Sequence, residues 1–356
     1  MKKKVGIIGT NGLPAKYGGF ETLTNYLVHN LNKEFDITVY CSSLHKKDPL
    51  KIFNGARLVH LPFSANGFQG IIYDILSILH SLFFMDVLLV LGSSGTLIFP
   101  LNYIFRKKIV FNFGGLDWQR EKWNYLTKKF LKLSEAFGVK FAQTIVVDNM
   151  VFGEYVRDNY KKESVLIEYG GDHVLPASDK AIMDKYNITL NEYFLSVSRA
   201  QEDNYIHILL DSFVQTPKLN LVVISNWHTS AYGINLKKNY SNYKNIKLID
   251  AVYDQKELDV IRSNANWYIH THSACGSAPS LIEAMSLSLP IISYDVPANR
   301  ATTENKALYF KDADEMKNIL KDINDYNCKE YATSMKEIAS RRYRWEIISK
   351  KYKETF

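Results

Sequence analysis

Short apolar runs rich in Val, Ile and Leu alternate with helical patterns along most of this chain. Between the first two runs, Phe20, Leu23, Leu27 and Leu31 recur at spacings of three and four, which indicates one buried face of a helix. Strands that alternate with helices in this way predict a parallel sheet with crossover helices. In the first half, the expected strands are 4–10, 37–42, 57–62, 86–91, 109–113, 144–147 and 165–169.

A polar segment, 173–191, interrupts the alternation and predicts a linker, because it contains Pro176 and has no strong periodicity. The alternation then restarts, with expected strands at 193–197, 219–225, 246–249, 267–271, 290–293 and 307–310. We therefore predict an α/β chain of two Rossmann-like, doubly wound domains, residues 1–175 and 176–340, that face each other across a cleft. The amphipathic end of the chain, 341–356, is expected to fold back on the first domain.

Composition agrees with two globular domains. The chain has 356 residues, of which 46% are hydrophobic, enough for two cores. Only three cysteines occur, so we expect a reducing cytoplasm rather than a disulfide framework. The first residues lead directly into a strand pattern, and no signal peptide is expected. The uncharged run 87–105 is long enough to suggest a membrane span, but its Gly, Ser, Pro and Asn residues favour a buried strand, a turn and a short helix.

Positive charge is concentrated between Arg106 and Lys140. Nine basic and three acidic residues give this segment a net charge of 9 − 3 = +6. The excess indicates an anionic partner, such as a phosphate or a membrane surface. Nucleic acid is not expected, because no nucleic-acid motif accompanies the charge. One helical stripe in this segment is interpreted as core, with its lysines on a solvated face or resting on anionic lipid: Trp123, Leu126, Phe130, Leu133 and Phe137.

A glycine-rich loop, 9–21, follows the first predicted strand, where open α/β sheets bind ligands. Gly18 and Gly19 let the backbone approach a ligand closely, and the helix start that follows suits a phosphate or a sugar hydroxyl. Glu21 lies in its first turn. The glycine spacing departs from G-x-G-x-x-G, which disfavours a dinucleotide site.

Two further loops of the first domain contain candidate residues. Asp117, Trp118 and Arg120 follow the fifth predicted strand, where they can contact a substrate. Asp148 ends the next strand and begins a helix, so it is either an N-cap or a base and hydroxyl binder in the site.

In the second domain, Arg199 follows the first predicted strand. Its guanidinium can hold a diphosphate bidentately, the alternative being an ordinary surface arginine. Glu283 lies one turn inside a later helix and is placed to accept hydrogen bonds from a ribose. The backbone N–H groups that precede this helix form a potential phosphate seat, at Ser277, Ala278, Pro279 and Ser280.

His270 and His272 share one face of the preceding strand. No metal is expected there, because a metal needs more ligands at suitable spacing. Asn299 and Arg300 end the next strand and face the same region. The pattern Asp312-x-Asp314, similar to a metal-binding D-x-D, is interpreted as helix capping.

Together these motifs resemble the GT-B glycosyltransferases of family 4. More narrowly, they resemble the subgroup with an N-terminal domain called DUF1972, which includes bacterial rhamnosyltransferases. The resemblance covers nearly the whole chain. Its motifs are matched at 9–21, 114–123, 148–149, 199–204, 270–285 and 295–300.

The resemblance implies a retaining, metal-independent transfer of a sugar from a nucleotide diphosphate to a hydroxyl. Arg199 and the 277–280 N–H groups would hold the diphosphate, Glu283 the ribose, and Gly18 and Gly19 would close over the phosphates. Four residues would shape the donor pocket: His270, His272, Asn299 and Arg300. Glu21, Trp118 and Arg120 are expected on the acceptor side.

Three departures from the family pattern concern the chemistry. Cys275 stands where many members carry a first acid, eight positions before Glu283, and Asn204 and Tyr205 replace a phosphate-binding lysine. Gly114 replaces an aspartate. Asp117 and Asp148 are then the best candidate acids of the first domain.

The expected donor is dTDP-L-rhamnose or a UDP-sugar, and no cofactor or metal is expected. The expected acceptor is a lipid-diphosphate-linked saccharide, in capsule or cell-surface polysaccharide synthesis. The enzyme would be cytoplasmic and peripherally bound to the anionic inner face of the cell membrane. Two alternatives stay open: a nucleotide-sugar 2-epimerase of the same architecture, and a nucleotide-binding scaffold without catalysis.

Overall fold

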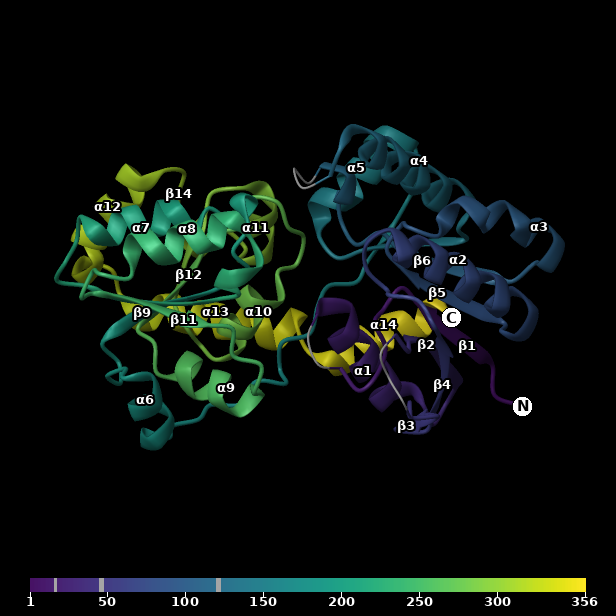
Figure 1. The fold of residues 1–356 in the computed structure, drawn as a ribbon, viewed down its shortest axis with the longest axis horizontal. Coiled ribbons are helices and arrows are strands. Elements are labelled where there is room, and N and C mark those ends of the chain that lie inside the picture. The colour runs from purple at the N-terminus through teal and green to yellow at the C-terminus, as the bar shows by residue number, and fades with distance from the viewer. Residues whose placement is uncertain (16–17, 45–47, 120–122) are drawn as a thin grey trace. The chain divides into compact units, whose positions relative to one another are not determined.

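The computed structural model describes residues 1–15, 18–44, 48–119 and 123–356 (Figure 1). It divides into unit 1, Met1–Glu168 with Trp345–Phe356, and unit 2, Tyr169–Arg344. The boundary after Glu168 comes a few residues before the predicted one after residue 175, because the segment 169–175 is hydrogen-bonded to unit 2. Gly171 N–H donates to the Tyr343 carbonyl (2.7 Å) and Leu175 N–H to the Asp259 carboxylate (3.1 Å).

Unit 1 is built on an eight-stranded sheet in the order β3-β4-β2-β1-β5-β6-β7-β8. All neighbouring strands are parallel except the antiparallel pair of β3 and β4. The seven predicted strands are confirmed, and the two-residue β3 is too short to show a pattern. The strands are β1 (Lys4–Ile8), β2 (Asp36–Ser42), β3 (Ile52–Phe53), β4 (Ala56–Leu61), β5 (Val87–Leu91), β6 (Lys108–Asn112), β7 (Thr144–Val147) and β8 (Val165–Leu166).

Helices cover this sheet and bury its apolar side chains. The last helix belongs to unit 1, where it packs on α1: Trp345 stacks on Tyr26 with ring centroids 4.5 Å apart, and Asn30 Nδ2 donates to Ser349 Oγ (2.9 Å). The helices are α1 (Gly19–Leu31), α2 (Gly67–Phe84), η1 (Thr96–Leu101), α3 (Asn102–Phe105), η2 (Asp117–Gln119), α4 (Tyr125–Phe141), α5 (Met150–Tyr160) and α14 (Trp345–Thr355).

The run 87–105 forms the buried strand β5 followed by short helices, as its turn residues predict. Within the described residues, α2 alone has the length and apolar composition of a membrane span. It nevertheless packs into the unit, since Tyr73, Ile78 and Leu82 are fully buried.

The interpretation of the stripe on α4 as core is wrong. Leu126 and Leu133 are exposed, and the buried face of α4 is instead Ser134, Glu135, Gly138 and Val139. The reason is close packing: a Cβ on Gly138 would lie 2.7 Å from the Phe111 ring, so the helix approaches the sheet through its small residues.

Unit 2 has a six-stranded, fully parallel sheet in the order β11-β10-β9-β12-β13-β14. All six predicted strands are confirmed. Its apolar core includes Phe213, Trp227 and Phe310. The strands are β9 (Tyr193–Val197), β10 (Asn220–Ser225), β11 (Ile246–Asp250), β12 (Trp267–His270), β13 (Ile291–Tyr294) and β14 (Leu308–Phe310).

The predicted linker is partly helical. Within it, α6 begins after Asp179, whose carboxylate accepts from Ala181 N–H (2.9 Å). The capping role of Asp312 is confirmed, since its carboxylate accepts from Glu315 N–H (2.9 Å). The helices of unit 2 are α6 (Lys180–Tyr186), η3 (Glu202–Asn204), α7 (Ile206–Val214), η4 (Trp227–Thr229), α8 (Ala231–Tyr240), α9 (Gln255–Ser263), α10 (Pro279–Ser286), α11 (Pro297–Thr302), α12 (Ala313–Lys321), η5 (Ile323–Asp325) and α13 (Cys328–Arg342).

Candidate active site

The strand order of unit 2 defines where a ligand binds. Numbered within the unit, the order is 3-2-1-4-5-6, which reverses direction between β9 and β12. In doubly wound sheets, ligands bind at the carboxyl ends of the strands at this switch point. The loops after β9 and β12 are therefore the first candidates for a binding site.

Hydrogen bonds join these loops to each other and to the loop after β13. Ser273 N–H donates to the Asp203 carbonyl (3.1 Å), and Asn204 Nδ2 donates to the Arg199 carbonyl (2.7 Å). The buried Asn299 donates from Nδ2 to the His272 and Tyr294 carbonyls (3.0 and 2.9 Å). Asn299 thus positions the loops, whereas the sequence predicted a pocket-shaping role.

Arg199 and the start of α10 lie on these joined loops. The Arg199 side chain is exposed, and it makes no ion pair with any residue that the structure describes. Ala278 is the N-cap of α10 and Pro279 its first residue, and no side chain caps the helix. N–H groups of a first turn that lack a capping side chain are available to an anion. Ser277 and Ala278 are buried beside it, and Ser280 is half-buried.

Glu283 is buried in α10 and held by two side chains. Its Oε2 pairs with a guanidinium nitrogen of the buried Arg262, on α9, and its Oε1 lies 3.1 Å from Nε2 of His173. Burial by itself raises the pKa of Glu283, but Arg262 and His173 outweigh it and lower the pKa below the usual range. Glu283 is therefore a fixed carboxylate.

Arg300 is engaged by its neighbours. Its Nε and Nη2 both donate to the Asp295 carboxylate, and its guanidinium lies 4.1 Å from the centre of the Tyr309 ring. The hydrogen bond from Arg300 lowers the pKa of Asp295. Arg300 is thus held in place by Asp295 and Tyr309 in the segment that follows β13.

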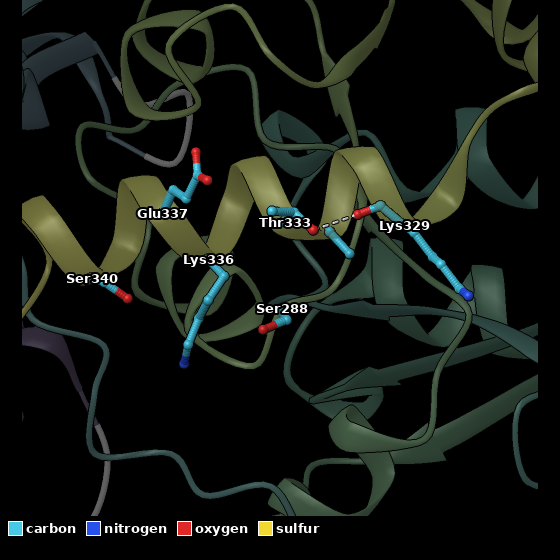
Figure 2. Close-up of a pocket in the computed structure, with 7 residues that line it drawn as sticks. Ser288, Lys329, Thr333, Lys336, Glu337 and Ser340 are labelled. Carbon is cyan, nitrogen blue, oxygen red and sulfur yellow. Dashed lines mark hydrogen bonds between the residues drawn. The ribbon is translucent and has the colours of Figure 1, made fainter.

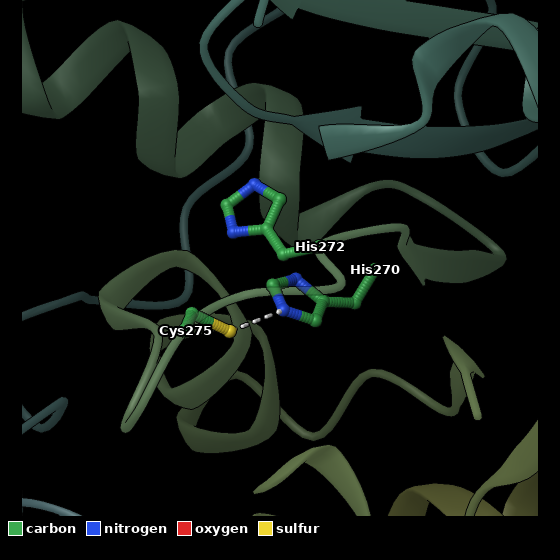
Figure 3. Close-up of side chains that lie close together, drawn as sticks. All are labelled: His270, His272 and Cys275. Atoms are coloured by element: carbon green, nitrogen blue, oxygen red, sulfur yellow. Dashed lines mark hydrogen bonds between the residues drawn. The ribbon is translucent and has the colours of Figure 1, made fainter. Parts of the chain in front are cut away.

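His270, His272 and Cys275 gather at the end of β12 and in the loop beyond it (Figure 3). The rings of His270 and His272 have centroids 4.4 Å apart, and Cys275 Sγ lies 3.8 Å from His270 Nε2. Burial, reinforced by His272, lowers the pKa of His270 well below its usual value, so its imidazole is neutral.

In unit 1 the order reverses between β1 and β5, and the glycine-rich loop lies at this point. Gly18, at φ 123°, is the N-cap of α1, and Gly19 begins the helix. The Glu21 carboxylate accepts from Asn11 N–H (2.8 Å) and Thr10 Oγ1 (3.2 Å). Glu21 therefore holds the loop in shape from within its own helix.

The other unit 1 candidates follow β6 and β7. The Lys132 ammonium lies 4.6 Å from the centre of the Trp118 ring, and it also pairs with the buried Glu135 (2.9 Å). Asp148 is half-buried at the end of β7, and the N-cap of α5 is Asn149, whose Oδ1 accepts from Val151 N–H (3.1 Å). Arg120 and the side chain of Asp117 lie outside the described residues.

A separate pocket of about 500 Å³ lies along α13 (Figure 2). One of its residues, Ser288, follows the C-terminal end of α10, opposite the end at which Pro279 begins the helix. The lining contains no histidine or cysteine, so it lacks the chemistry of the loops after β9 and β12. It is formed by Ser288, Lys329, Ala332, Thr333, Lys336, Glu337 and Ser340.

The sequence did not identify Arg262 and His173 as partners of Glu283, or Cys275 as a neighbour of the two histidines. Arg262 and His173 reach Glu283 from α9 and from the segment after β8. No local pattern marks a contact that only tertiary packing creates. The short spacing His270-x-His272-x-x-Cys275 was visible, and the loop conformation that turns the thiol back was not.

Comparison with known proteins identifies the fold as GT-B. Sucrose-phosphate synthase from Thermosynechococcus elongatus is 15% identical, with a TM-score of 0.83 over 99% of this chain and 98% of that chain. HepE of Anabaena, in complex with UDP and glucose, is 14% identical, with a TM-score of 0.77 over 100% and 99%. A Listeria monocytogenes protein assigned as a UDP-N-acetylglucosamine 2-epimerase is 13% identical, with a TM-score of 0.63 over 98% and 94%. Among curated proteins, no sequence matches this chain.

The protein is thus a two-domain chain of the GT-B class, as predicted. Residues 178–342 match the family of glycosyl transferases group 1, and residues 2–172 match the domain of unknown function DUF1972. The chain belongs to the group 1 glycosyltransferases that carry a DUF1972 domain, and it is a glycosyltransferase.

Proposed function

We propose that this enzyme transfers a sugar, with retention and without a metal, from a nucleoside diphosphate to a hydroxyl group, and that unit 2 binds the donor. The observation that carries the proposal is the joining of the loops after β9, β12 and β13 at the switch point, because the exposed Arg199 and the start of α10 both lie on these loops. HepE, with the same fold, was solved with UDP and glucose, which supports a nucleotide-sugar donor.

The chemistry mainly requires that charge growing on the departing diphosphate be stabilised. Arg199 and the N–H groups at the start of α10 supply a fixed cation and a helix dipole for this purpose. Glu283, held as a carboxylate by Arg262 and His173, has lone pairs left to accept from ribose hydroxyls. Asp148 and Asp117 are the acids proposed to serve the acceptor side.

The proposed donor is dTDP-L-rhamnose, with a UDP-sugar as the alternative. Deoxyribose lacks the 2′-hydroxyl, so Glu283 would bind only the 3′-hydroxyl of a dTDP donor and both hydroxyls of a UDP donor. The base preference is therefore a property that binding measurements can resolve directly.

The proposed acceptor is a lipid-diphosphate-linked saccharide at the cytoplasmic face of the membrane, in capsule or cell-surface polysaccharide synthesis. Unit 1 has exposed apolar side chains on α2, η1, α3 and α4, here called the apolar patch: Phe83, Phe84, Leu101, Tyr103, Ile104, Leu126 and Leu133. Ring contacts join α2, α3 and the end of α4, because Phe83 packs on Phe105 (4.7 Å) and Tyr103 on Phe141 (6.0 Å).

Basic side chains border the apolar patch. Lys140 lies 5.3 Å from the Phe141 ring, Lys129 lies 4.5 Å from the Tyr125 ring, and Arg106 is exposed at the end of α3. Apolar side chains bordered by cations suit an anionic lipid surface, since the rings enter the interface while the cations meet head groups. This arrangement supports peripheral binding and extends the lysine-face interpretation to the exposed stripe of α4.

A donor screen tests the proposal. The full chain is incubated with UDP-, GDP- and dTDP-sugars and lipid-linked acceptors, and nucleotide release and products are measured with and without chelator. We expect nucleotide to be released from one of the donors only when acceptor is present, and we expect chelator not to slow this release. An epimer formed without acceptor would establish the epimerase alternative, and nucleotide binding without turnover of any donor the scaffold alternative; either result rejects the proposal.

A further inference from the structure

We propose that His270, His272 and Cys275 form a binding site for a thiophilic divalent cation, with zinc as the preferred ion. The ligand atoms of the three side chains all lie within 4.8 Å of one another, and Cys275 Sγ is 3.8 Å from His270 Nε2. Zn–N and Zn–S bonds of about 2.0–2.3 Å in a tetrahedron separate neighbouring ligand atoms by roughly 3.3–3.7 Å. Small side-chain rotations therefore suffice to close the three atoms around one ion.

The fold brings the three ligands together without a long loop. His270 is the last residue of β12, and His272 follows two positions later, so both imidazoles project to one side of the chain. The loop then returns Cys275 to His270 before α10 begins (Figure 3). This combination of imidazole and thiolate ligands is the kind that zinc takes in proteins.

A buried neighbour fixes the site from outside. Asn299, on α11, accepts from the Cys275 thiol through Oδ1 (3.6 Å) and donates from Nδ2 to the His272 carbonyl (3.0 Å). Asn299 thus holds the backbone of the second histidine, and metal binding would release the hydrogen bond that it accepts from the thiol.

Metal binding requires imidazoles in their neutral form and a cysteine in its thiolate form. On binding, the Cys275 S–H bond breaks, its proton goes to solvent, and the thiolate electron pair forms the metal–sulfur bond. Two neutral imidazoles and one thiolate leave the fourth position of a tetrahedral ion open to water or an anion.

This inference does not rest on the proposed function. The proposed transfer places the diphosphate charge on Arg199 and the N–H groups of α10, so it needs no cation at the histidines. The cation site would therefore be additional to transfer, and it is measured by binding alone.

Cobalt(II) provides the direct probe, because a cobalt–thiolate bond adds a charge-transfer band in the near ultraviolet. The reduced, chelator-stripped full chain is titrated with Co²⁺, and Zn²⁺ is then added to displace it. We expect the band to saturate at one Co²⁺ per chain and to disappear with one equivalent of Zn²⁺. Absence of the band, or of displacement by Zn²⁺, would overturn the proposal.

Variants assign the site. Cys275→Ser should abolish the band and weaken Zn²⁺ binding at least 10-fold, while Cys328→Ser, at an exposed cysteine, should change neither. Circular dichroism establishes that both variants are folded. As a readout independent of colour, Zn²⁺ should protect Cys275 from alkylation in the unmodified chain, as measured by mass spectrometry. A band that survives Cys275→Ser, or unprotected Cys275 in saturating Zn²⁺, would overturn the assignment.

Discussion

The carboxylate of Glu283 forms a buried ion pair with the guanidinium of Arg262, at 9% and 2% exposure. His173 completes the arrangement on the second carboxylate oxygen. The residue that the sequence assigned to ribose binding is thus already fixed by two partners from other elements. In the proposed site, this preorganises the carboxylate before the donor arrives.

Arg262→Met should strongly destabilise unit 2. Removing one member of a buried ion pair leaves an uncompensated charge and typically costs about 3–5 kcal/mol. Urea unfolding of the full chain, with the transition of unit 2 followed separately, measures the loss. The control is Lys185→Ala, which removes an exposed partner of Glu257 and should leave this transition nearly unchanged.

The stability difference between wild type and Arg262→Met should depend on pH. The folded pKa of Glu283 is lowered below its usual 4.5, so the ion pair contributes its full stability above pH 4.5 and loses it as pH falls through the folded value. The difference in the free energy of unfolding between wild type and Arg262→Met should therefore become smaller as the pH falls below 4.5. A difference constant down to the acid limit of folding would contradict this account of Glu283.

Asp74→Asn should stabilise unit 1 at alkaline pH. Asp74 is buried in α2 and accepts a hydrogen bond from Ser94, and burial, partly offset by this bond, raises its pKa to about 7. Because the folded chain holds this proton more tightly than the unfolded chain, ionisation costs stability as pH rises from about 4 to 7. The gain from Asn should reach up to roughly 4 kcal/mol at pH 8 and vanish near pH 4.

Urea unfolding at a series of pH values tests this prediction, and Ser94→Ala is its matched control. Loss of the hydrogen bond that favours the carboxylate should raise the pKa of Asp74 further and extend the stability loss to higher pH. Equal pH profiles for wild type and Asp74→Asn would mean that Asp74 ionises normally.

Tyr103→Ser with Ile104→Ser should reduce binding to anionic vesicles at least 10-fold. Both side chains are exposed in the apolar patch, at 75% and 77%. Losing their apolar area removes well over 1.4 kcal/mol of burial, the equivalent of that factor. Co-sedimentation with phosphatidylglycerol vesicles measures binding, with phosphatidylcholine vesicles for comparison. Ile234→Ser, at an exposed apolar position in unit 2, should bind as wild type does.

Much of the fold was predictable because parallel strands are continuous apolar runs. β5 and β12 have every residue buried, and β12 stands out between polar segments. The short α6 in the predicted linker was missed because seven residues show little periodicity. The predicted buried face of α4 was wrong because Gly138 and Ser134 are on the buried face and Leu126 and Leu133 are exposed, which a hydrophobic stripe cannot indicate.

The candidate site was predictable only as a set of loops. Arg199 and Asn299 follow strands and His270 ends one, and adjacency of those strands brings their loops together. Arg300 is held by Asp295 of its own motif, but Glu283 is held by Arg262 from another helix, a partner that depends on tertiary packing and that no motif reveals.

The most direct test is calorimetric titration of UDP and dTDP into the full chain and into two variants. Arg199→Ala removes the exposed guanidinium after β9, and Lys329→Ala removes a cation from the separate pocket on α13. A charge-assisted hydrogen bond to phosphate contributes about 1.5–3 kcal/mol, so Arg199→Ala should weaken the bound nucleotide at least 10-fold. Lys329→Ala should bind as wild type does. Unchanged affinity in Arg199→Ala, or loss of binding in Lys329→Ala, would contradict a donor site at the switch point of unit 2.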